Sequence, residues 1–333
     1  YKRDSEYVEL GKDFQPHAAK LLSFFSEKIG KYPYAQYSVI MAGDGGMEYA
    51  MCTFIDGVGH PTMRSLYSVT SHEIAHTWFQ FLMATNESKH SWMDEGFTSY
   101  IDDVAMNVIL NEGKALPNAN AYKDYFRWVA TGLEEPMTTH ADRFKFNTGY
   151  GMSAYDKGSI FLSQLQYIIG KENFDNTLKK YFNDWSFRHP KPNDFIRSAE
   201  KVSGLELDWY LLDWAQSTMT IDYSINSVYG VDNKTKIVLK RIGQMGMPID
   251  IRIVLESGEY LDYNIPMTKM RGSKPLNNST LLDSWSWAKP YYEFWINIDS
   301  NDISKILIDP KNEMADIDSC LLYTSPSPRD SFR

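Results

Sequence analysis

The chain has little of what marks several broad classes of protein. Only two cysteines, Cys52 and Cys320, occur in its 333 residues, so we expect no disulfide framework and two free thiols. No window approaches the roughly 20 continuous apolar residues of a membrane-spanning helix, and we predict no transmembrane segment. Lysine and arginine form no continuous stripe and the net charge is −9, so we predict no nucleic-acid partner.

The two ends of the chain also lack familiar signals. The first residues show neither an initiator Met nor a signal-peptide pattern, so we expect the chain to be truncated at its start. Residues 319–333 crowd Pro, Ser and Arg together, and we expect them to be a non-native or disordered tail. The cellular compartment and the oligomeric state stay open.

The first two-thirds of the chain has mainly helical periodicity. Apolar residues at three and four spacing predict a helix over 14–29. Short apolar runs predict strands over 37–41 and 51–55, with a glycine-rich loop between them. From about residue 70 to 218 the pattern is helical with a few breaks, so this part is predicted to be a mostly helical domain.

After residue 221, apolar residues recur at every second position instead of at three and four spacing. Residues 249–265 alternate apolar and polar side chains around a Ser-Gly turn, which predicts a β-hairpin, and further strand patterns flank it. The whole chain is therefore predicted to be α+β. We place a catalytic domain at 1–218, a small antiparallel β-sandwich at 219–318 and the tail at 319–333.

The strongest chemical signal is the stretch SHEIAHTWFQ. On a helix, His72 and His76 lie one turn apart on the same face, where two imidazoles can hold a zinc ion. Glu73, next to the first histidine, is placed to take a proton from a water at that ion. Two other interpretations stay open, since Thr70 with Glu73 also fits a helix capping box and the histidines could be ordinary polar residues.

A third ligand candidate follows in SWMDEGFTSY. Glu95 follows His76 after eighteen intervening residues, early in the next helical stretch, where an antiparallel return could bring it to the same ion. Two histidines and one carboxylate leave an open position for water on a catalytic zinc. The joint pattern predicts one Zn²⁺ per chain.

These motifs resemble those of the aminopeptidase N family of zinc peptidases, in the gluzincin group. There, the two histidines and a glutamate from a W-x-x-E-G-F segment bind zinc, and here that segment is Trp92–Phe97. The resemblance implies a thermolysin-like catalytic domain with His72, His76 and Glu95 as metal ligands. It also implies that Glu73 is the general base.

The resemblance assigns roles outside the zinc motif as well. Tyr155, in AYDKG, matches the family tyrosine whose hydroxyl stabilises the oxyanion. The implied substrate-binding residues are Gly45, Gly46, Met47 and Glu48. In the family this glutamate binds the free amino terminus of the substrate. The match is imperfect because Tyr49 replaces the usual Asn and Asp44 adds an acid.

Weaker candidates lie near these motifs. Asp102 falls two helical turns after Glu95 and could accept the second N–H of a ligand histidine. The remaining polar residues nearby are interpreted as helix surface, core or loop residues: Asp94, Cys52, His60 and His90.

The sequence thus predicts a zinc-dependent aminopeptidase that acts on peptides with a free N-terminus. A zinc endopeptidase is the first alternative, since it would keep the ligands and the base but ignore the amine. A non-catalytic scaffold of the same fold is the second. The relatives also carry an N-terminal saddle-shaped domain that this chain lacks, so we expect weak turnover from the chain alone.

Overall fold

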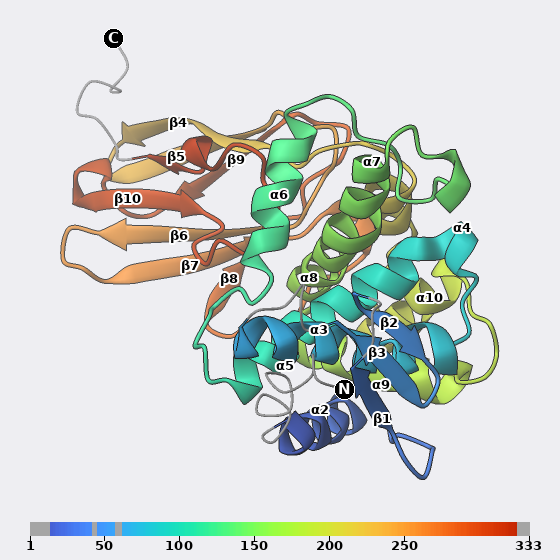
Figure 1. Ribbon diagram of the computed structural model, residues 1–333. Helices are drawn as coiled ribbons and strands as arrows, with labels where there is room; N and C mark the ends of the chain where they lie inside the picture. Colours follow the sequence, from blue (N-terminus) through green and yellow to red (C-terminus); the bar gives the residue numbers. More distant parts are fainter. Residues whose placement is uncertain (1–13, 42–44, 57–61, 325–333) are drawn as a thin grey trace. The chain divides into compact units, whose positions relative to one another are not determined.

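The computed structural model describes residues 14–41, 45–56 and 62–324 (Figure 1). The chain forms two compact units, which are treated separately below. One comprises Tyr1–Ser163 and Glu172–Ser198, and the other comprises Gln164–Lys171 and Ala199–Arg333. This division lies upstream of the domain boundary placed at 218/219, which stays a prediction.

The first unit is mainly helical, and the helix predicted over 14–29 is confirmed as α2. The α-helices of the described residues are α2 (Phe14–Lys28), α3 (Met63–Ala75), α4 (Glu87–Ser91), α5 (Phe97–Ile109), α6 (Ala119–Val129), α7 (Asn147–Gly151), α8 (Gly158–Ile169), α9 (Lys171–Trp185), α10 (Pro192–Ser203) and α11 (Asp208–Tyr210). The π-helical segments are η1 (Thr77–Leu82), η2 (Trp92–Gly96), η4 (Met152–Lys157) and η5 (Leu211–Ala215). The short 3-10 turns are η3 (Ala141–Arg143), η6 (Thr268–Met270), η7 (Ser300–Asp302) and η8 (Ser319–Leu321).

A small mixed sheet lies between α2 and α3 in the sequence. Its strands are β1 (Ser38–Met41), β2 (Met47–Tyr49) and β3 (Cys52–Ile55), in the order β1-β3-β2. β3 runs parallel to β1 and antiparallel to β2. Both predicted strands are confirmed as β1 and β3, and the glutamate of GGMEY lies on the edge strand β2.

The core of the first unit is built from aromatic rings. Phe97 packs edge-on against Phe195 at 4.7 Å between ring centroids, and Trp92 packs against Phe161 at 4.9 Å. All four rings have no exposed surface. Burying such large rings is worth several kcal/mol. It also fixes both ends of the Trp92–Phe97 segment that carries the candidate ligand.

The second unit holds two further sheets. The strands are β4 (Tyr223–Val231), β5 (Lys234–Arg241), β6 (Ile249–Leu255), β7 (Tyr260–Ile265), β8 (Ser279–Leu281), β9 (Tyr291–Ile296), β10 (Ile303–Ile308) and β11 (Tyr323–Thr324). One sheet has the order β11-β10-β6-β7-β8 and the other the order β4-β5-β9. The strands predicted after residue 221 are therefore confirmed.

The predicted hairpin corresponds to β6 and β7. Ile249, Ile251 and Ile253 are fully buried, and they alternate with more exposed residues as the period of two requires. Ile251 pairs with Tyr263 across the two strands. The turn between them contains Gly258 at φ 87°, a conformation that favours glycine.

Part of the predicted tail makes contacts in this unit. Tyr323–Thr324 forms β11, which pairs antiparallel with β10, and the amide of Ile308 donates to the carbonyl of Leu322 at 2.7 Å. Only residues 325–333 of the tail lie outside the described part of the chain.

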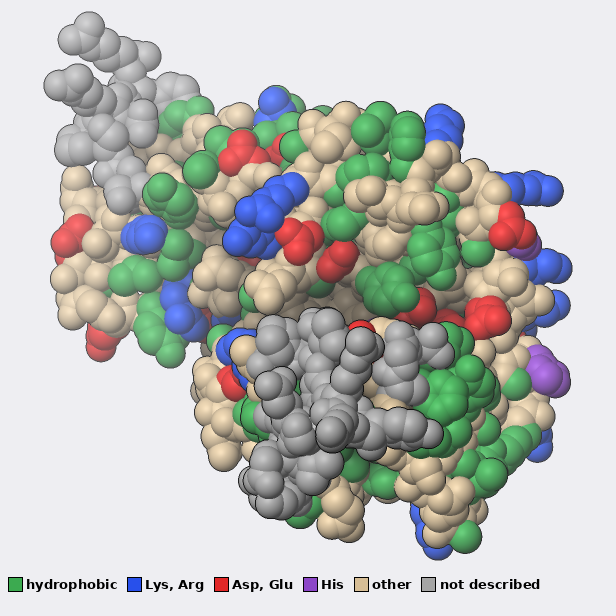
Figure 2. All heavy atoms as spheres, in the orientation of Figure 1, with side chains coloured by type: hydrophobic (Ala, Val, Ile, Leu, Met, Phe, Trp, Pro, Cys, Tyr) green, Lys and Arg blue, Asp and Glu red, His purple; other side chains and the backbone are tan. Residues whose placement is uncertain are grey.

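Cys52 and Cys320 are free thiols. Within the described residues, no helix is both long and apolar enough to span a bilayer. On the visible face, lysine and arginine side chains are interspersed with acidic ones (Figure 2).

Candidate active site

Helix α3 carries the two histidines and the glutamate of the zinc motif. The helix begins with a capping box between Thr62 and Ser65, whose side chains each bond the other's backbone amide. Thr70 lies well inside the helix and its hydroxyl donates to the carbonyl of Leu66 at 2.8 Å. The capping interpretation of Thr70 with Glu73 is therefore wrong.

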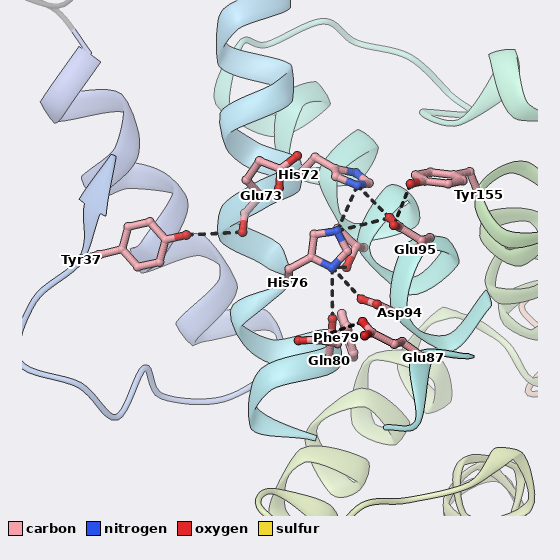
Figure 3. Close-up of polar contacts among 11 residues, drawn as sticks. Tyr37, His72, Glu73, His76, Phe79, Gln80, Glu87, Asp94, Glu95 and Tyr155 are labelled. Carbon is pink, nitrogen blue, oxygen red and sulfur yellow. Dashed lines mark hydrogen bonds and ion pairs between the residues drawn. The ribbon is translucent and has the colours of Figure 1, made fainter. Parts of the chain in front are cut away.

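Two imidazole nitrogens and one carboxylate oxygen lie close together beside this helix (Figure 3). His72 Nε2 lies 3.1 Å from His76 Nε2, and Glu95 Oε2 lies 3.2 Å from each of the two nitrogens. Two neutral imidazoles can share only one proton across such a contact, whereas a cation can bind both. Zinc bonds of 2.0–2.1 Å in a tetrahedron give edges of roughly 3.3–3.4 Å. The observed triangle fits three ligands of one zinc ion.

Segment η2 brings Glu95 to the histidines. Trp92 and Phe97 are buried at its two ends, and Asp94 and Glu95 between them contact His76. Gly96 then lies against Gly158, because a Cβ built on Gly96 would come 2.5 Å from the Gly158 Cα. The backbones of η2 and the start of α8 are therefore too close at this point to leave room for a side chain between them.

Segment η4 supplies Tyr155 to the same site. Its hydroxyl donates to Glu95 Oε1 at 2.6 Å, and its ring stacks on the imidazole of His72 at 5.9 Å between centroids (Figure 3). Glu95 therefore uses one oxygen toward the histidines and the other toward Tyr155. The structure brings together all five residues that the sequence placed at the zinc and oxyanion positions.

Buried contacts hold η4 on its far side. Lys157, with 1% exposed surface, forms an ion pair with the buried carboxylate of Glu134. The hydroxyl of Ser153 donates to the carbonyl of Glu135 at 3.5 Å. Removing one partner of a buried pair leaves an uncompensated charge, so the pair resists displacement of η4.

Asp94 is the residue that the sequence analysis missed. Its carboxylate lies 2.6 Å from His76 Nδ1 and it is 3% exposed, so the prediction that it lies on a helix surface is wrong. The predicted candidate for this position, Asp102, is buried and interacts electrostatically with His72. One of its oxygens has no hydrogen-bond partner in the described chain, and its role stays a prediction.

The electrostatics of the site follow from burial and from the charges nearby. Burial raises the pKa of the Glu73 carboxyl to about 8; His76 opposes this shift, and the Glu48 and Glu95 carboxylates add to it. Burial also acts to raise the pKa of Glu95, but hydrogen bonds from His72 and His76 outweigh it and hold that pKa well below its usual range. A bound divalent cation would favour the ionised form of both acids.

The GGMEY segment contributes residues to the lining of the same cavity as Glu95. A Cβ on Gly46 would come 2.6 Å from Glu73 Oε1, so a larger residue there would require the candidate base to move. A Cβ on Gly45 would meet nothing within 4 Å. Glu48 lines the same cavity as Glu73 and the two histidines, and Met47 is also part of its lining.

The remaining sequence candidates lie on α4, on β3 or outside the described residues. His90 lies in α4 and is half-buried, and Cys52 is partly buried on β3. Asp44 and His60 lie outside the described residues.

Comparison with known proteins identifies the family. The Peptidase family M1 domain matches residues 16–214, which is more than half of the chain. The chain belongs to peptidase family M1. The match of this M1 chain covers α3, η2 and η4 and so contains every candidate site residue. Family M1 is zinc-dependent in general, in agreement with the donor set of the triangle.

Individual relatives of the M1 chain are aminopeptidases. Human aminopeptidase B is 29% identical over 211 residues, covering 56% of this chain and 32% of the relative. Aminopeptidase M1 of Arabidopsis thaliana is 24% identical over 304 residues, covering 85% of this chain and 33% of the relative. The M1 chain thus spans about a third of the length of these relatives.

A solved structure supports the fold. The structure of Legionella pneumophila aminopeptidase A in complex with aspartic acid aligns with a TM-score of 0.60 and 16% identity, covering 91% of the M1 chain and 34% of the other. This alignment shows a shared mixed helix-and-sheet fold.

Proposed function

We propose that this chain is the catalytic part of a zinc-dependent aminopeptidase that hydrolyses the N-terminal peptide bond of peptides. The observation that carries the proposal is the triangle of His72 Nε2, His76 Nε2 and Glu95 Oε2, with sides of 3.1–3.2 Å. Membership of family M1 and the aminopeptidase relatives support the same activity. We also propose a thermolysin-like arrangement for 1–218 and a β-sandwich for 219–318.

The metal would be held by His72, His76 and Glu95, one ion per chain. When bound, zinc polarises the scissile carbonyl and acidifies the attacking water. Asp94 accepts a hydrogen bond from His76 Nδ1–H and so keeps Nε2 free to act as a ligand.

Three further residues of the chain act on the substrate. Glu73 takes the proton of the attacking water on its carboxylate and returns it to the leaving amine. Tyr155 donates its hydroxyl proton in a hydrogen bond to the oxyanion, a contribution of roughly 3 kcal/mol. Glu48 binds the substrate ammonium and so selects the first peptide bond, because a peptide without that ammonium leaves the acid unpaired.

The test compares two substrates in the zinc-loaded protein. One is a short peptide with a free amino terminus, and its control is the same peptide N-acetylated. Cleavage of the free peptide alone is the expected result. Equal cleavage of both would make the protein an endopeptidase, and binding of zinc without cleavage of either would favour the scaffold alternative.

A further inference from the structure

The methionines of the chain differ sharply in their exposure. The chain has 15 methionines, and all of them lie within the described residues. Only Met41, Met47 and Met51 are exposed, with 43%, 40% and 41% of their surface open to solvent, while every other methionine is buried or half-buried. All three belong to β1, to β2 or to the turn between β2 and β3. The exposed thioethers are therefore concentrated on one small sheet of the first unit.

Met47 differs from the other two because it lines the zinc-site cavity, the hollow that contains the zinc triangle. This cavity has a volume of about 380 Å³, and Met47 lies in its lining next to Glu48. Met41 lines a separate groove, and Met51 lies in the turn after β2. Among the exposed methionines, only Met47 can change a wall of the zinc-site cavity when its side chain is altered.

The backbone on either side of Met47 is held in place. The hydroxyl of the fully buried Thr53 donates to the carbonyl of Met47 at 2.9 Å, and Met47 pairs with Phe54 in the antiparallel ladder of β2 and β3. The preceding residue, Gly46, is so close to Glu73 that an added Cβ would come 2.6 Å from its Oε1. The segment therefore has little room to withdraw if the Met47 side chain gains an atom.

A hydroperoxide converts a methionine thioether into a sulfoxide in one step. The sulfur lone pair forms the new S–O bond, the O–O bond of the peroxide breaks, and the departing oxygen takes up a proton and leaves as water or an alcohol. The sulfur is oxidised by two electrons and the peroxide is reduced by two. The product is a polar, chiral side chain in place of a flexible apolar one, and methionine sulfoxide reductases reverse the change.

We propose that Met47 is a site of reversible oxidation by hydroperoxides and that its sulfoxide weakens substrate binding in the zinc-site cavity. Solvent exposure lets a peroxide reach this sulfur, whereas the buried methionines are shielded. The new oxygen would lie beside Glu48, in a cavity with no lysine or arginine among its described lining residues. An apolar substrate side chain packed against this wall would cover the polar oxygen, and covering a polar group without a hydrogen bond is costly.

The inference rests on the proposed aminopeptidase function, and its test follows both the oxidation and its effect. Zinc-loaded protein is treated with hydrogen peroxide, oxygen uptake at each methionine is measured by peptide mass spectrometry, and hydrolysis of leucine p-nitroanilide is assayed. We expect the three exposed methionines to gain oxygen before the buried ones. KM should rise about 10-fold as Met47 is oxidised, with kcat nearly unchanged, because the altered contact is made equally before and during the reaction. Methionine sulfoxide reductases for both epimers should restore KM.

Variants separate Met47 from the other oxidisable residues. Met47→Leu removes the sulfur but keeps an apolar side chain of similar size, so its own KM should stay constant on peroxide treatment. Met41→Leu and Met51→Leu are the matched controls and should respond to peroxide as the wild type does. Cys52→Ser removes the partly buried thiol on β3 and should also respond as the wild type does.

Ligand binding gives a readout that does not depend on turnover. Leucine hydroxamate should bind the oxidised wild type about 10-fold more weakly than the untreated wild type in calorimetry. It should bind the treated and untreated forms of Met47→Leu equally well.

The outcomes separate this proposal from the proposed function. Wild-type protein that binds zinc but does not cleave the anilide would contradict the aminopeptidase function, and the mass spectra with the hydroxamate titration would still test Met47. Oxygen uptake at Met41 and Met51 but not at Met47 would overturn the modification site. An oxidised Met47 with unchanged hydroxamate affinity would overturn its effect on binding. A Met47→Leu variant that loses affinity as the wild type does would also overturn it, since the sensitive residue would then lie elsewhere.

Discussion

The contact between Gly96 and Gly158 predicts a large effect from a single methyl group. In Gly96→Ala, the new Cβ would lie 2.5 Å from the Gly158 Cα and 2.7 Å from the Ala154 carbonyl oxygen. Carbon atoms in contact lie about 3.5–4.0 Å apart, so η2 and η4 must separate by about 1 Å. Glu95 is carried on one of these segments and Tyr155 on the other.

This separation can be converted into expected losses. The Tyr155 to Glu95 hydrogen bond of 2.6 Å would lengthen toward the limit of a hydrogen bond. Overpacking of this kind costs about 2 kcal/mol of stability. A displacement of about 1 Å at a catalytic site can lower the rate about 100-fold. We therefore expect both a lower melting temperature and a kcat/KM reduced about 100-fold.

The assay measures thermal unfolding and anilide hydrolysis at saturating zinc. Gly151→Ala is the matched control, because Gly151 precedes η4 in a helical conformation at φ −56° and a Cβ there meets nothing within 4 Å. That control should retain full activity and gain up to about 0.5 kcal/mol. If Gly96→Ala behaves like the control, the close packing of η2 on η4 does not position Tyr155.

Three further changes test other parts of the site. Glu73→Gln should lower kcat by about 10²–10⁴ while zinc stays bound, and loss of zinc in elemental analysis would contradict the role of Glu73 as a base. Asp94→Asn should weaken zinc binding 10–100-fold in a chelator titration, because a neutral amide accepts the hydrogen bond from His76 Nδ1–H less strongly than a carboxylate does. An unchanged zinc affinity would refute the supporting role of Asp94. Lys157→Met should lower the free energy of unfolding by about 3–5 kcal/mol by leaving Glu134 unpaired, and the double variant with Glu134→Leu should recover most of the loss in denaturant unfolding. A double variant no more stable than the single one would mean that the pair's charge is not the cause.

The zinc motif could be predicted because it depends on local geometry. The separation of four residues between His72 and His76 puts both imidazoles on one helix face in any α-helix. Glu95 and Tyr155 are 60 residues apart in sequence but meet in space, and no periodicity predicts such a contact. Glu95 could still be proposed as a ligand from its spacing after His76, whereas Tyr155 was indicated only by the family motif.

Asp94 was missed for a physical reason. In an ordinary α-helix, adjacent residues point about 100° apart, so Asp94 and Glu95 would not both be expected to face the histidines. The π-helical turn η2 is wider and rotates successive residues less, so Asp94 and Glu95 both reach the histidines.

The two oxygens of Glu95 contact different partners, and this limits which residues the position tolerates. Glutamine has only one oxygen, so an amide group would have to face either the histidines or Tyr155. Aspartate keeps both oxygens but is shorter by a methylene group and could not reach both partners from the same backbone. The position therefore accepts a single amino acid for two independent reasons. A glutamate here in a newly found sequence would be informative even where the surrounding motif has diverged.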